Sequence, residues 1–227
     1  MAFSDLAVRV HDVRDRIEAA RTRGGRGQPV TMIAVTKTHG PEAVDAAVAC
    51  GIRDMGENKV QEALGKMPVT AADLRWHLIG HLQRNKAKGA AHFAMVHSLD
   101  SARLADALDA AAAQDGHPLD VLIQVNVAGE AQKSGVAPAD VEALAAHVAS
   151  LSSLRVAGVM CMAPFTDHEP TLRHAFRGAR EALAVVRASG HPAAHELSMG
   201  MSGDYEIAVE EGATLVRLGT VLFGARS

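Results

Sequence analysis

The feature of this sequence that most restricts its fold is a repeated alternation between short apolar runs and alanine-rich stretches. The first apolar run covers residues 30–37 and contains β-branched side chains, which favour strands. Seven further runs lie near residues 52–55, 76–79, 95–97, 121–127, 156–160, 196–199 and 214–218. Helical stretches separate most of them, at residues 41–50, 101–114, 140–150, 171–189 and 204–211. Strands that alternate with helices in this way are typical of parallel βαβ units.

Two architectures are compatible with this alternation. An open, doubly wound sheet usually has about five or six strands, whereas a closed barrel has eight and typically about 250 residues. With about eight candidate strands in 227 residues, we predict an α/β protein that forms one TIM-like (β/α)8 barrel. No linker and no shift in composition divides the chain, so we expect a single domain over residues 1–227.

An additional helix is expected before the first strand. Leu6, Val10, Val13 and Ile17 recur at spacings of three and four residues, which is the period of one face of a helix. The Ser–Asp pair at residues 4–5 is predicted to cap its start, and the glycine-rich segment 24–27 is predicted to end it near residue 23.

The composition excludes several classes of protein. A net charge of −3, one Trp and one Tyr argue against nucleic-acid binding, which usually needs a positive surface and aromatic platforms. No run approaches the roughly 20 apolar residues of a membrane span, and the charged start lacks a signal-peptide core. Cys50 and Cys161 form no CxxC motif or disulfide framework, so we expect two small buried side chains. A soluble, cytoplasmic protein that contacts neither membrane nor nucleic acid is therefore predicted.

Lys37 is the least ordinary polar residue, because it ends the first predicted strand. Side chains at 31, 33, 35 and 37 point to one face of that strand, so the ammonium group would follow apolar residues into the barrel mouth. Burial would lower its pKa and free the lone pair that attacks an aldehyde or ketone. A lysine that has left the strand and points to solvent is an equally weighted alternative.

Two small turns follow the seventh and eighth predicted strands, where barrels often hold a phosphate. The first is Ser198-Met199-Gly200-Met201-Ser202-Gly203-Asp204, and the second is Leu218-Gly219-Thr220. Their glycines permit close approach of the backbone and their hydroxyls can donate hydrogen bonds. Two ordinary turns without a ligand are the alternative.

Arg217 lies among apolar residues on the last predicted strand. A guanidinium in such a place needs an anion or a strong acceptor. We weigh contact with a ligand equally with a structural pairing to Glu57 or Glu210.

The remaining polar residues carry weaker signals. Asn58, His77, His81 and Asn126 lie in or just after predicted strands. The sequence has twelve histidines but no HExxH motif and no Cys/His cluster at ligand spacing, so no metal site is predicted. It also lacks a Walker loop, a dinucleotide fingerprint and a G-x-S-x-G motif.

Read in order, the motifs of this chain resemble those of the pyridoxal phosphate homeostasis protein family. They include Ala34-Val35-Thr36-Lys37, Gly56-Glu57-Asn58-Lys59-Val60-Gln61-Glu62, Trp76-His77-Leu78-Ile79-Gly80, Leu82-Gln83-Arg84-Asn85-Lys86, Lys133-Ser134-Gly135, Leu197-Ser198-Met199-Gly200-Met201-Ser202, Val216-Arg217-Leu218-Gly219-Thr220 and the segment 221–226. The resemblance covers nearly the whole chain, and the shared order of so many motifs makes it specific.

The resemblance implies a barrel similar to the amino-terminal domain of bacterial alanine racemase, with pyridoxal 5′-phosphate as its cofactor. It implies that Lys37 forms the Schiff base and that Arg217 faces the pyridine nitrogen. It places Asn58 and His77 near the cofactor. The implied phosphate contacts are Ser198, Met199, Gly200, Gly219 and Thr220. The sequence departs from the family pattern at Thr36, where many members have Ser, and at the variable position of His81.

Three functional hypotheses follow. The first is a non-catalytic carrier or buffer of pyridoxal phosphate, which affects vitamin B6 balance, acts as a monomer and contacts apoenzymes transiently. The second is a racemase-like or decarboxylase-like enzyme with the same cofactor. The third is a Schiff-base aldolase that uses Lys37 without a cofactor.

A racemase needs a second acid/base opposite the lysine, and the single Tyr205 lies beyond the predicted phosphate loop. An arginine at the pyridine nitrogen would also weaken the electron sink. Both arguments favour the carrier.

Overall fold

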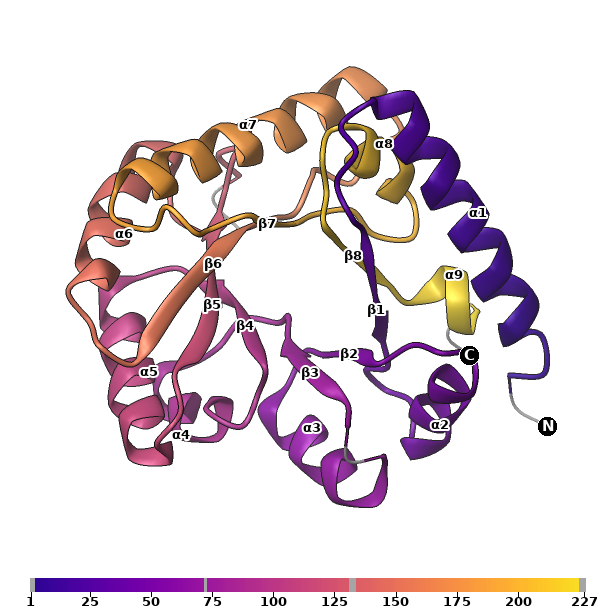
Figure 1. Cartoon of the computed structure of the whole chain (residues 1–227), viewed down its shortest axis with the longest axis horizontal. Coiled ribbons are helices and arrows are strands. Elements are labelled where there is room, and N and C mark those ends of the chain that lie inside the picture. Colours follow the sequence, from indigo (N-terminus) through magenta and orange to yellow (C-terminus); the bar gives the residue numbers. More distant parts are fainter. Residues whose placement is uncertain (1–2, 72, 131–133, 225–227) are drawn as a thin grey trace.

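Eight parallel strands close into a barrel in sequence order (Figure 1). The computed structural model describes residues 3–71, 73–130 and 134–224. The strands are β1 (Thr31–Val35), β2 (Asp54–Glu57), β3 (Arg75–Leu78), β4 (Met95–Leu99), β5 (Leu119–Val125), β6 (Leu154–Cys161), β7 (Glu196–Ser198) and β8 (Leu215–Leu218). Strand β8 pairs with β1, with Thr31 opposite Leu215 and Ala34 opposite Leu218. The predicted (β/α)8 barrel is confirmed, and the doubly wound alternative is wrong.

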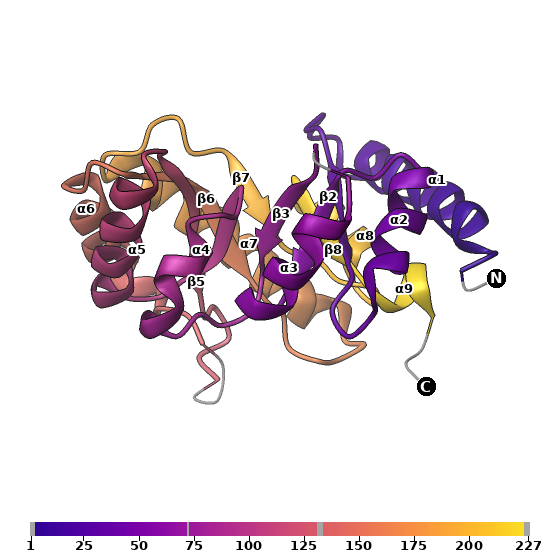
Figure 2. The same ribbon diagram turned by 90° about the horizontal axis from the view of Figure 1, so that it is seen from below.

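Helices surround the barrel on its outer side, as the side view in Figure 2 shows. They are α1 (Leu6–Gly24), α2 (Pro41–Ala49), α3 (Val60–Lys66), α4 (Ala87–Ala90), α5 (Ala102–Asp115), α6 (Val141–Ala149), α7 (Glu169–Ala188), α8 (Tyr205–Glu210) and α9 (Thr220–Phe223). Three short 3₁₀ turns lie at Met67–Val69, Arg84–Lys86 and Pro138–Asp140. The main hydrophobic core lies between the strands and this outer layer.

The additional helix before the first strand is confirmed as α1. Leu6, Val10, Val13 and Ile17 are all buried, because this face of α1 packs against α8 and α9. The predicted cap is different. Neither side chain of the pair at residues 4–5 bonds to the start of the helix, because the Ser4 hydroxyl donates to Asp5 Oδ1 instead.

The second strand begins two residues later than the apolar pattern predicted. Gly51 adopts a φ of +77°, which prolongs the turn after α2 and delays the start of β2 to Asp54. The paired part of β2 then includes Gly56 and Glu57, which carry no apolar signal. Its register with β1 places Met55 opposite Ala34.

The barrel interior changes from apolar to polar toward the carboxyl ends of the strands. Its apolar layer consists of Ile33, Met95, Leu122, Met160 and Leu215. Two residues further along β4, β5 and β8 the buried side chains are His97, Gln124 and Arg217. Since alternate residues of a strand share one face, the same pattern that fills the barrel also delivers polar groups to its carboxyl end.

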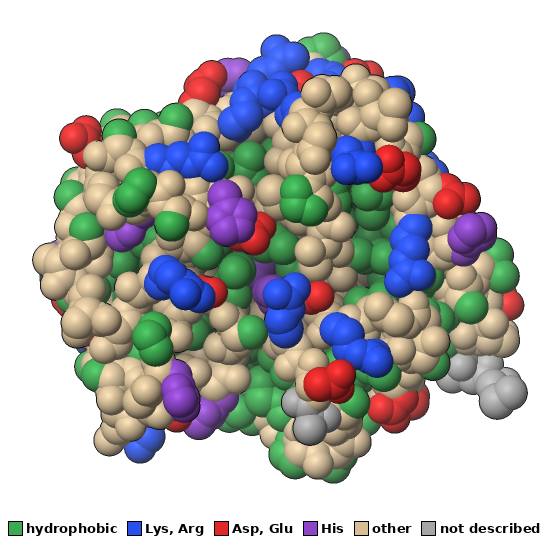
Figure 3. All heavy atoms as spheres, viewed as in Figure 1, with side chains coloured by type: hydrophobic (Ala, Val, Ile, Leu, Met, Phe, Trp, Pro, Cys, Tyr) green, Lys and Arg blue, Asp and Glu red, His purple; other side chains and the backbone are tan. Residues whose placement is uncertain are grey.

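Neither cysteine forms a disulfide; Cys161 is buried, as predicted, and Cys50 is only half-buried. In the part of the chain that the structure describes, no helix has the length and the apolar character needed to cross a membrane. The face seen in Figure 3 shows basic and acidic side chains interspersed over the surface.

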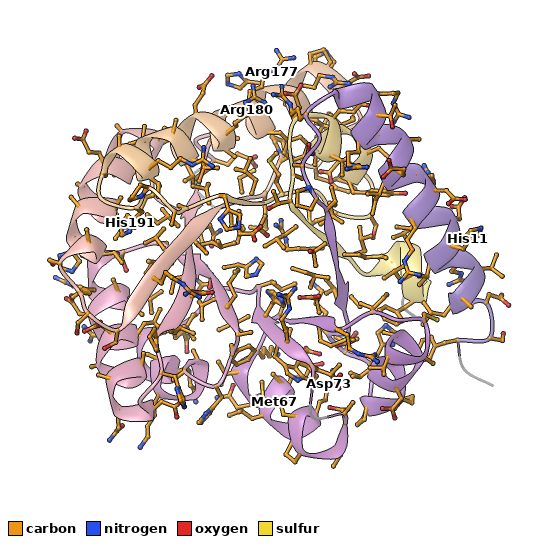
Figure 4. The ribbon with its side chains drawn as sticks, in the orientation of Figure 1. His11, Met67, Asp73, Arg177, Arg180 and His191 are labelled. Atoms are coloured by element: carbon orange, nitrogen blue, oxygen red, sulfur yellow. The ribbon has the colours of Figure 1, made fainter. Side chains whose placement is uncertain are left out.

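An ionic cluster fastens α8 to α7. Arg177 and Arg180 extend from α7 (Figure 4), and both contact the carboxylate of Glu211, at 3.2 and 3.1 Å. Arg173, also on α7, reaches Glu210 Oε2 at 2.5 Å. The cluster therefore fixes the end of α8, the helix that follows one of the two predicted phosphate turns.

Candidate functional site

A cavity of about 750 Å³ opens at the carboxyl ends of the strands. Of the predicted cofactor contacts, five line it: Lys37, Asn58, Arg217, Gly219 and Thr220. These residues come from the ends of β1, β2 and β8. The volume lies within the range of about 300–1,000 Å³ usual for small-molecule sites.

Lys37 lies two residues beyond β1 and is half-buried in the cavity wall, in line with Ile33 and Val35. The next residue, Thr38, has a φ of +69°. A β-branched residue rarely adopts this left-handed conformation, and such positions cluster where a structure holds the backbone for a purpose. The chain therefore turns sharply just after the lysine.

A buried ion pair holds the backbone on both sides of Lys37. Lys66, from α3, places its Nζ 2.6 Å from Glu57 Oε1 and 2.9 Å from the carbonyl oxygen of Thr36. Lys66 also reaches Glu62 Oε1 at 3.0 Å, and the same oxygen accepts a 2.6 Å hydrogen bond from the amide of Thr38. We call Glu57, Glu62 and Lys66 the loop anchor.

The two carboxylates of the loop anchor differ in their acidity. Burial raises the pKa of Glu57, although hydrogen bonds from Lys66 and Thr36 favour its ionised form. Burial also acts on Glu62, but there the hydrogen bonds from the Thr38 amide and Lys66 outweigh it and lower the pKa. The sequence motif at residues 56–62 contained Glu57 and Glu62 but not Lys66. The convergence of the three residues on the lysine loop depends on how α3 packs and was not foreseen.

The turn after β7 lines the cavity with its second half. Met201, Ser202, Gly203 and Asp204 are in the wall. Within the described residues the amides of Ser202 and Gly203 donate to no protein acceptor, whereas the Met201 amide donates to Asp204 Oδ1 at 2.6 Å. These two unpaired backbone N–H groups, together with Gly219 and Thr220, form a suitable anion-binding site, which we call the anion seat.

The first half of the same turn lies deeper than the cavity wall. The Ser198 hydroxyl is buried in the barrel, and the Met199 amide donates to the carbonyl oxygen of Leu215. Gly200 has a φ of +91°, and its carbonyl oxygen accepts from the amide of Arg217. A Cβ atom at Gly200 would lie 2.6 Å from that of Ala208. These three residues shape the turn, and Ser202 and Gly203 are the members that reach the cavity.

Arg217 is 4% exposed and lines the cavity from β8. Its Nη1 donates to the Ser198 hydroxyl at 2.7 Å and its Nη2 to the carbonyl oxygen of Cys161 at 3.0 Å. The predicted structural pairing to Glu57 or Glu210 is wrong, because those carboxylates are held by Lys66 and by Arg23 and Arg173. Burial lowers the pKa of Arg217, but a guanidinium stays charged throughout the physiological range. It keeps N–H groups for a ligand.

His77 lies inside the barrel and does not line the cavity. Its Nε2 contacts Asp54 Oδ1 and its Nδ1 contacts His97 Nε2, both at 2.9 Å. His97 is fully buried, and burial lowers its pKa well below the ordinary value, with His77 and Arg217 acting in the same direction. Asp54 and His97 were not recognised as site residues in the sequence, although His97 follows Met95 on the inward face.

His81, which follows β3, also lines the cavity, and its Nδ1 lies 3.5 Å from Asp100 Oδ2. The apolar side chains of Met162 and Phe165, in the loop after β6, line the cavity as well and are exposed. Tyr205, the only tyrosine, is buried and does not line the cavity. Within the described ranges, no cluster of three or more His, Cys, Asp or Glu side chains could hold a metal ion.

Known proteins share both the sequence and the barrel. The family described as "Alanine racemase, N-terminal domain" matches residues 8–227. A pyridoxal phosphate homeostasis protein from Pseudomonas aeruginosa is 45% identical over 227 residues, covering 99% of this chain and 97% of that one. Its Escherichia coli K12 namesake is 40% identical over 233 residues, covering 99% of this chain and 98% of that one.

Solved structures give the same result. PipY of Synechococcus elongatus, in a structure with PLP bound, superposes with a TM-score of 0.83 at 37% identity, covering 96% of this chain and all of PipY. Alanine racemase from Corynebacterium glutamicum has a TM-score of 0.74 at 15% identity and shares the fold over 62% of its length. This chain therefore belongs to the alanine racemase N-terminal domain family and, within it, to the pyridoxal phosphate homeostasis proteins.

Proposed function

We propose that this protein binds pyridoxal 5′-phosphate in the cavity at the carboxyl ends of its strands. It holds the cofactor covalently through Lys37 Nζ and buffers its supply without turning over a substrate. The observation that carries the proposal is that one cavity is lined by Lys37, by the buried Arg217 and by the turn whose Ser202 and Gly203 amides have no protein acceptor in the described structure. The relative PipY, at 37% identity, has been solved with PLP bound.

Each reactive part of pyridoxal phosphate has a suitable group in the cavity. The aldehyde requires an amine, and Lys37 supplies one at the end of β1. The pyridine nitrogen is an acceptor, and Arg217 has N–H groups in addition to the two used by Ser198 and Cys161. The phosphate requires several donors, which the amides of Ser202 and Gly203 and the hydroxyl of Thr220 provide. The donor set therefore fits the cofactor.

The cofactor, when bound, supplies an aldehyde that condenses with an amine with loss of water, and a ring that withdraws electrons. The chain's own residues hold and orient it. The loop anchor fixes the backbone beside Lys37 through Thr36 and Thr38. Arg217 would donate to the ring nitrogen and would keep it unprotonated, because a guanidinium does not release a proton in this range.

Two arguments favour a carrier over a catalyst. With Arg217 at the ring nitrogen, the ring would be a weaker electron sink than with a carboxylate partner. The only tyrosine is buried outside the cavity, so it provides no acid/base opposite Lys37. We include a monomeric state and transient contact with apoenzymes in the proposal; the exposed Met162 and Phe165 beside the cavity mouth offer such contact.

A second candidate function rests on His81. This side chain lines the cavity and is paired to Asp100, so it could exchange a proton with an amino acid bound there. Residual racemase-like activity is the corresponding prediction. Its test is hydrogen exchange with solvent at the α-carbon of an amino acid, compared between the natural protein and His81→Gln.

The experiment that tests the main proposal compares two lysine variants. Lys37→Ala removes the amine at the cavity, and Lys88→Ala removes an exposed lysine on α4 outside it. After incubation with pyridoxal phosphate and borohydride, Lys88→Ala should retain the cofactor through dialysis under denaturing conditions, and Lys37→Ala should lose it. Retention in Lys37→Ala would place the covalent bond on another residue.

A further inference from the structure

A continuous row of five buried side chains crosses the barrel interior. From β2 to β8 it contains Asp54, His77, His97, Ser198 and Arg217, each from a different strand. The successive contacts are 2.9 Å, 2.9 Å, 2.8 Å and 2.7 Å between the polar atoms. We call this row the interior chain. Its last member borders the cavity at the carboxyl-terminal end of the barrel, and its first lies at the start of β2, toward the amino-terminal end.

The two ends of the interior chain fix the direction of its hydrogen bonds. Arg217 has donors only, so the Ser198 oxygen must accept from it. The Ser198 hydroxyl contacts one other described side chain, His97 Nδ1, which therefore receives its hydrogen. An ionised Asp54 has acceptors only, so His77 must donate from Nε2.

The middle of the interior chain has one arrangement that satisfies every group. His97 accepts at Nδ1, so as a neutral ring it carries its proton on Nε2 and donates to His77 Nδ1. All four hydrogen bonds then run from Arg217 toward Asp54. The reverse arrangement would put a proton on His97 Nδ1 and leave the Ser198 hydrogen without an acceptor in the described structure.

The far end of the interior chain is close to solvent. The Asp54 side chain is 10% exposed and lies 2.6 Å from Arg75 Nη2, whose side chain is 59% exposed. Every other link is buried. The negative charge of Asp54 therefore lies at the amino-terminal face of the barrel. Arg217, at the other end of the row, borders the cavity on the carboxyl-terminal side.

We propose that Asp54 is a positioning residue for Arg217, and that it acts through the interior chain. With the native direction, Ser198 donates to His97 and becomes a better acceptor for the guanidinium, since linked hydrogen bonds polarise one another. Arg217 is then held with its remaining N–H groups toward the cavity. The consequence for the pyridine nitrogen of the cofactor rests on the proposed function; the direction of the row does not.

The first test needs neither the cofactor nor a variant. Histidine ¹⁵N resonances of the ligand-free protein should show both His77 and His97 as neutral rings with the proton on Nε2. A proton on His97 Nδ1 would overturn the proposed direction.

A matched pair of variants tests the role of the carboxylate. In Asp54→Asn the side-chain amide can donate as well as accept, so this end of the row no longer excludes the reverse direction. The reverse direction should therefore gain population beside the native one, although it leaves the Ser198 hydrogen without an acceptor, and signal should move toward the Nδ1–H forms. Asp120→Asn is the control, because Asp120 pairs with Arg155 at the start of the neighbouring strands but does not contact the interior chain. Identical histidine spectra in the two variants would overturn the role of Asp54. If Asp54→Asn does not fold, the spectrum of the natural protein still decides the direction.

The second test uses pyridoxal phosphate labelled with ¹⁵N in the ring. Its nitrogen resonance should shift in Asp54→Asn by more than in Asp120→Asn, because the guanidinium that donates to it is less firmly held. If the cofactor binds and the ring nitrogen responds equally in both variants, this inference fails and the proposed function stands. If the histidine spectra agree with the proposed direction but the cofactor does not bind, the proposed function fails and the interior chain stands.

Discussion

Lys66 Nζ lies 2.6 Å from Glu57 Oε1, and both side chains are almost completely buried beside the loop that carries Lys37. The ammonium group also bonds to the carbonyl oxygen of Thr36, so the ion pair is connected directly to the backbone next to Lys37. Buried pairs of this kind cost desolvation free energy and are not an efficient way to stabilise a fold. Their position here indicates that they hold the lysine loop in one conformation.

Lys66→Met should destabilise the protein by about 3–5 kcal/mol, because it leaves the Glu57 carboxylate buried without its partner. Urea unfolding followed by circular dichroism measures the loss. The double variant Glu57→Gln/Lys66→Met should lose less than the sum of the two single variants, since it leaves no unpaired charge. Additive losses would show that the two residues do not act as a pair.

Gly200→Ala should destabilise the protein and loosen the turn after β7. The added Cβ would lie 2.6 Å from Ala208 Cβ, and the backbone has a φ of +91°; the expected loss is about 1–3 kcal/mol. Gly203→Ala, in the same turn, is the control, because a Cβ there meets nothing within 4 Å. Thermal unfolding of the ligand-free variants separates them, and equal melting temperatures would contradict this explanation.

Thr220→Val should weaken retention of the cofactor without changing the fold. Loss of one hydroxyl donor at the anion seat corresponds to about 1–3 kcal/mol, or a roughly 5- to 150-fold weaker affinity for pyridoxal phosphate. Titration by absorption gives the dissociation constant. Thr22→Val, on the exposed part of α1, is the matched control. An unchanged constant in Thr220→Val would move the phosphate away from this turn.

Stability should fall on acidification through about pH 6.5, and His97 should account for part of the fall. Burial lowers the pKa of His97 in the folded state, so below about pH 6.5 only the unfolded chain takes up this proton. The loss of folding stability due to His97 is therefore absent above about pH 6.5. Below that pH the loss grows, by at most about 1.4 kcal/mol per pH unit. Urea unfolding at pH 7.5, 6.5 and 5.5 should show a shallower dependence for His97→Asn. Parallel curves would refute the assignment.

The sequence was sufficient to predict the barrel, because eight apolar runs separated by helices leave few closed arrangements. For Lys37 the alternation along one strand left two equally weighted orientations, and its place in the cavity wall agrees with the one that continues from Ile33 and Val35. The domain limits over residues 1–227 and the carrier role stay predictions.

The side-chain contacts between residues on different strands could not be predicted from the sequence. Arg217 was expected to meet an anion or a strong acceptor, but the sequence did not indicate that the Ser198 hydroxyl and the Cys161 carbonyl oxygen, 19 and 56 residues away, are its acceptors. The partners of His77 depend on the register of β2, β3 and β4, which no local pattern specifies. In the turn after β7, the sequence did not distinguish the depths of its two serines: Ser198 lies inside the barrel, whereas Ser202 lines the cavity. The predicted phosphate contacts stay predictions.

Peptide mapping of the borohydride-reduced protein tests the central claim most directly. The natural protein, loaded with pyridoxal phosphate and reduced, should carry one cofactor-derived adduct, located on the peptide that contains Lys37. An adduct on a different lysine, or none after saturation with the cofactor, would contradict the assignment of this cavity as the cofactor site.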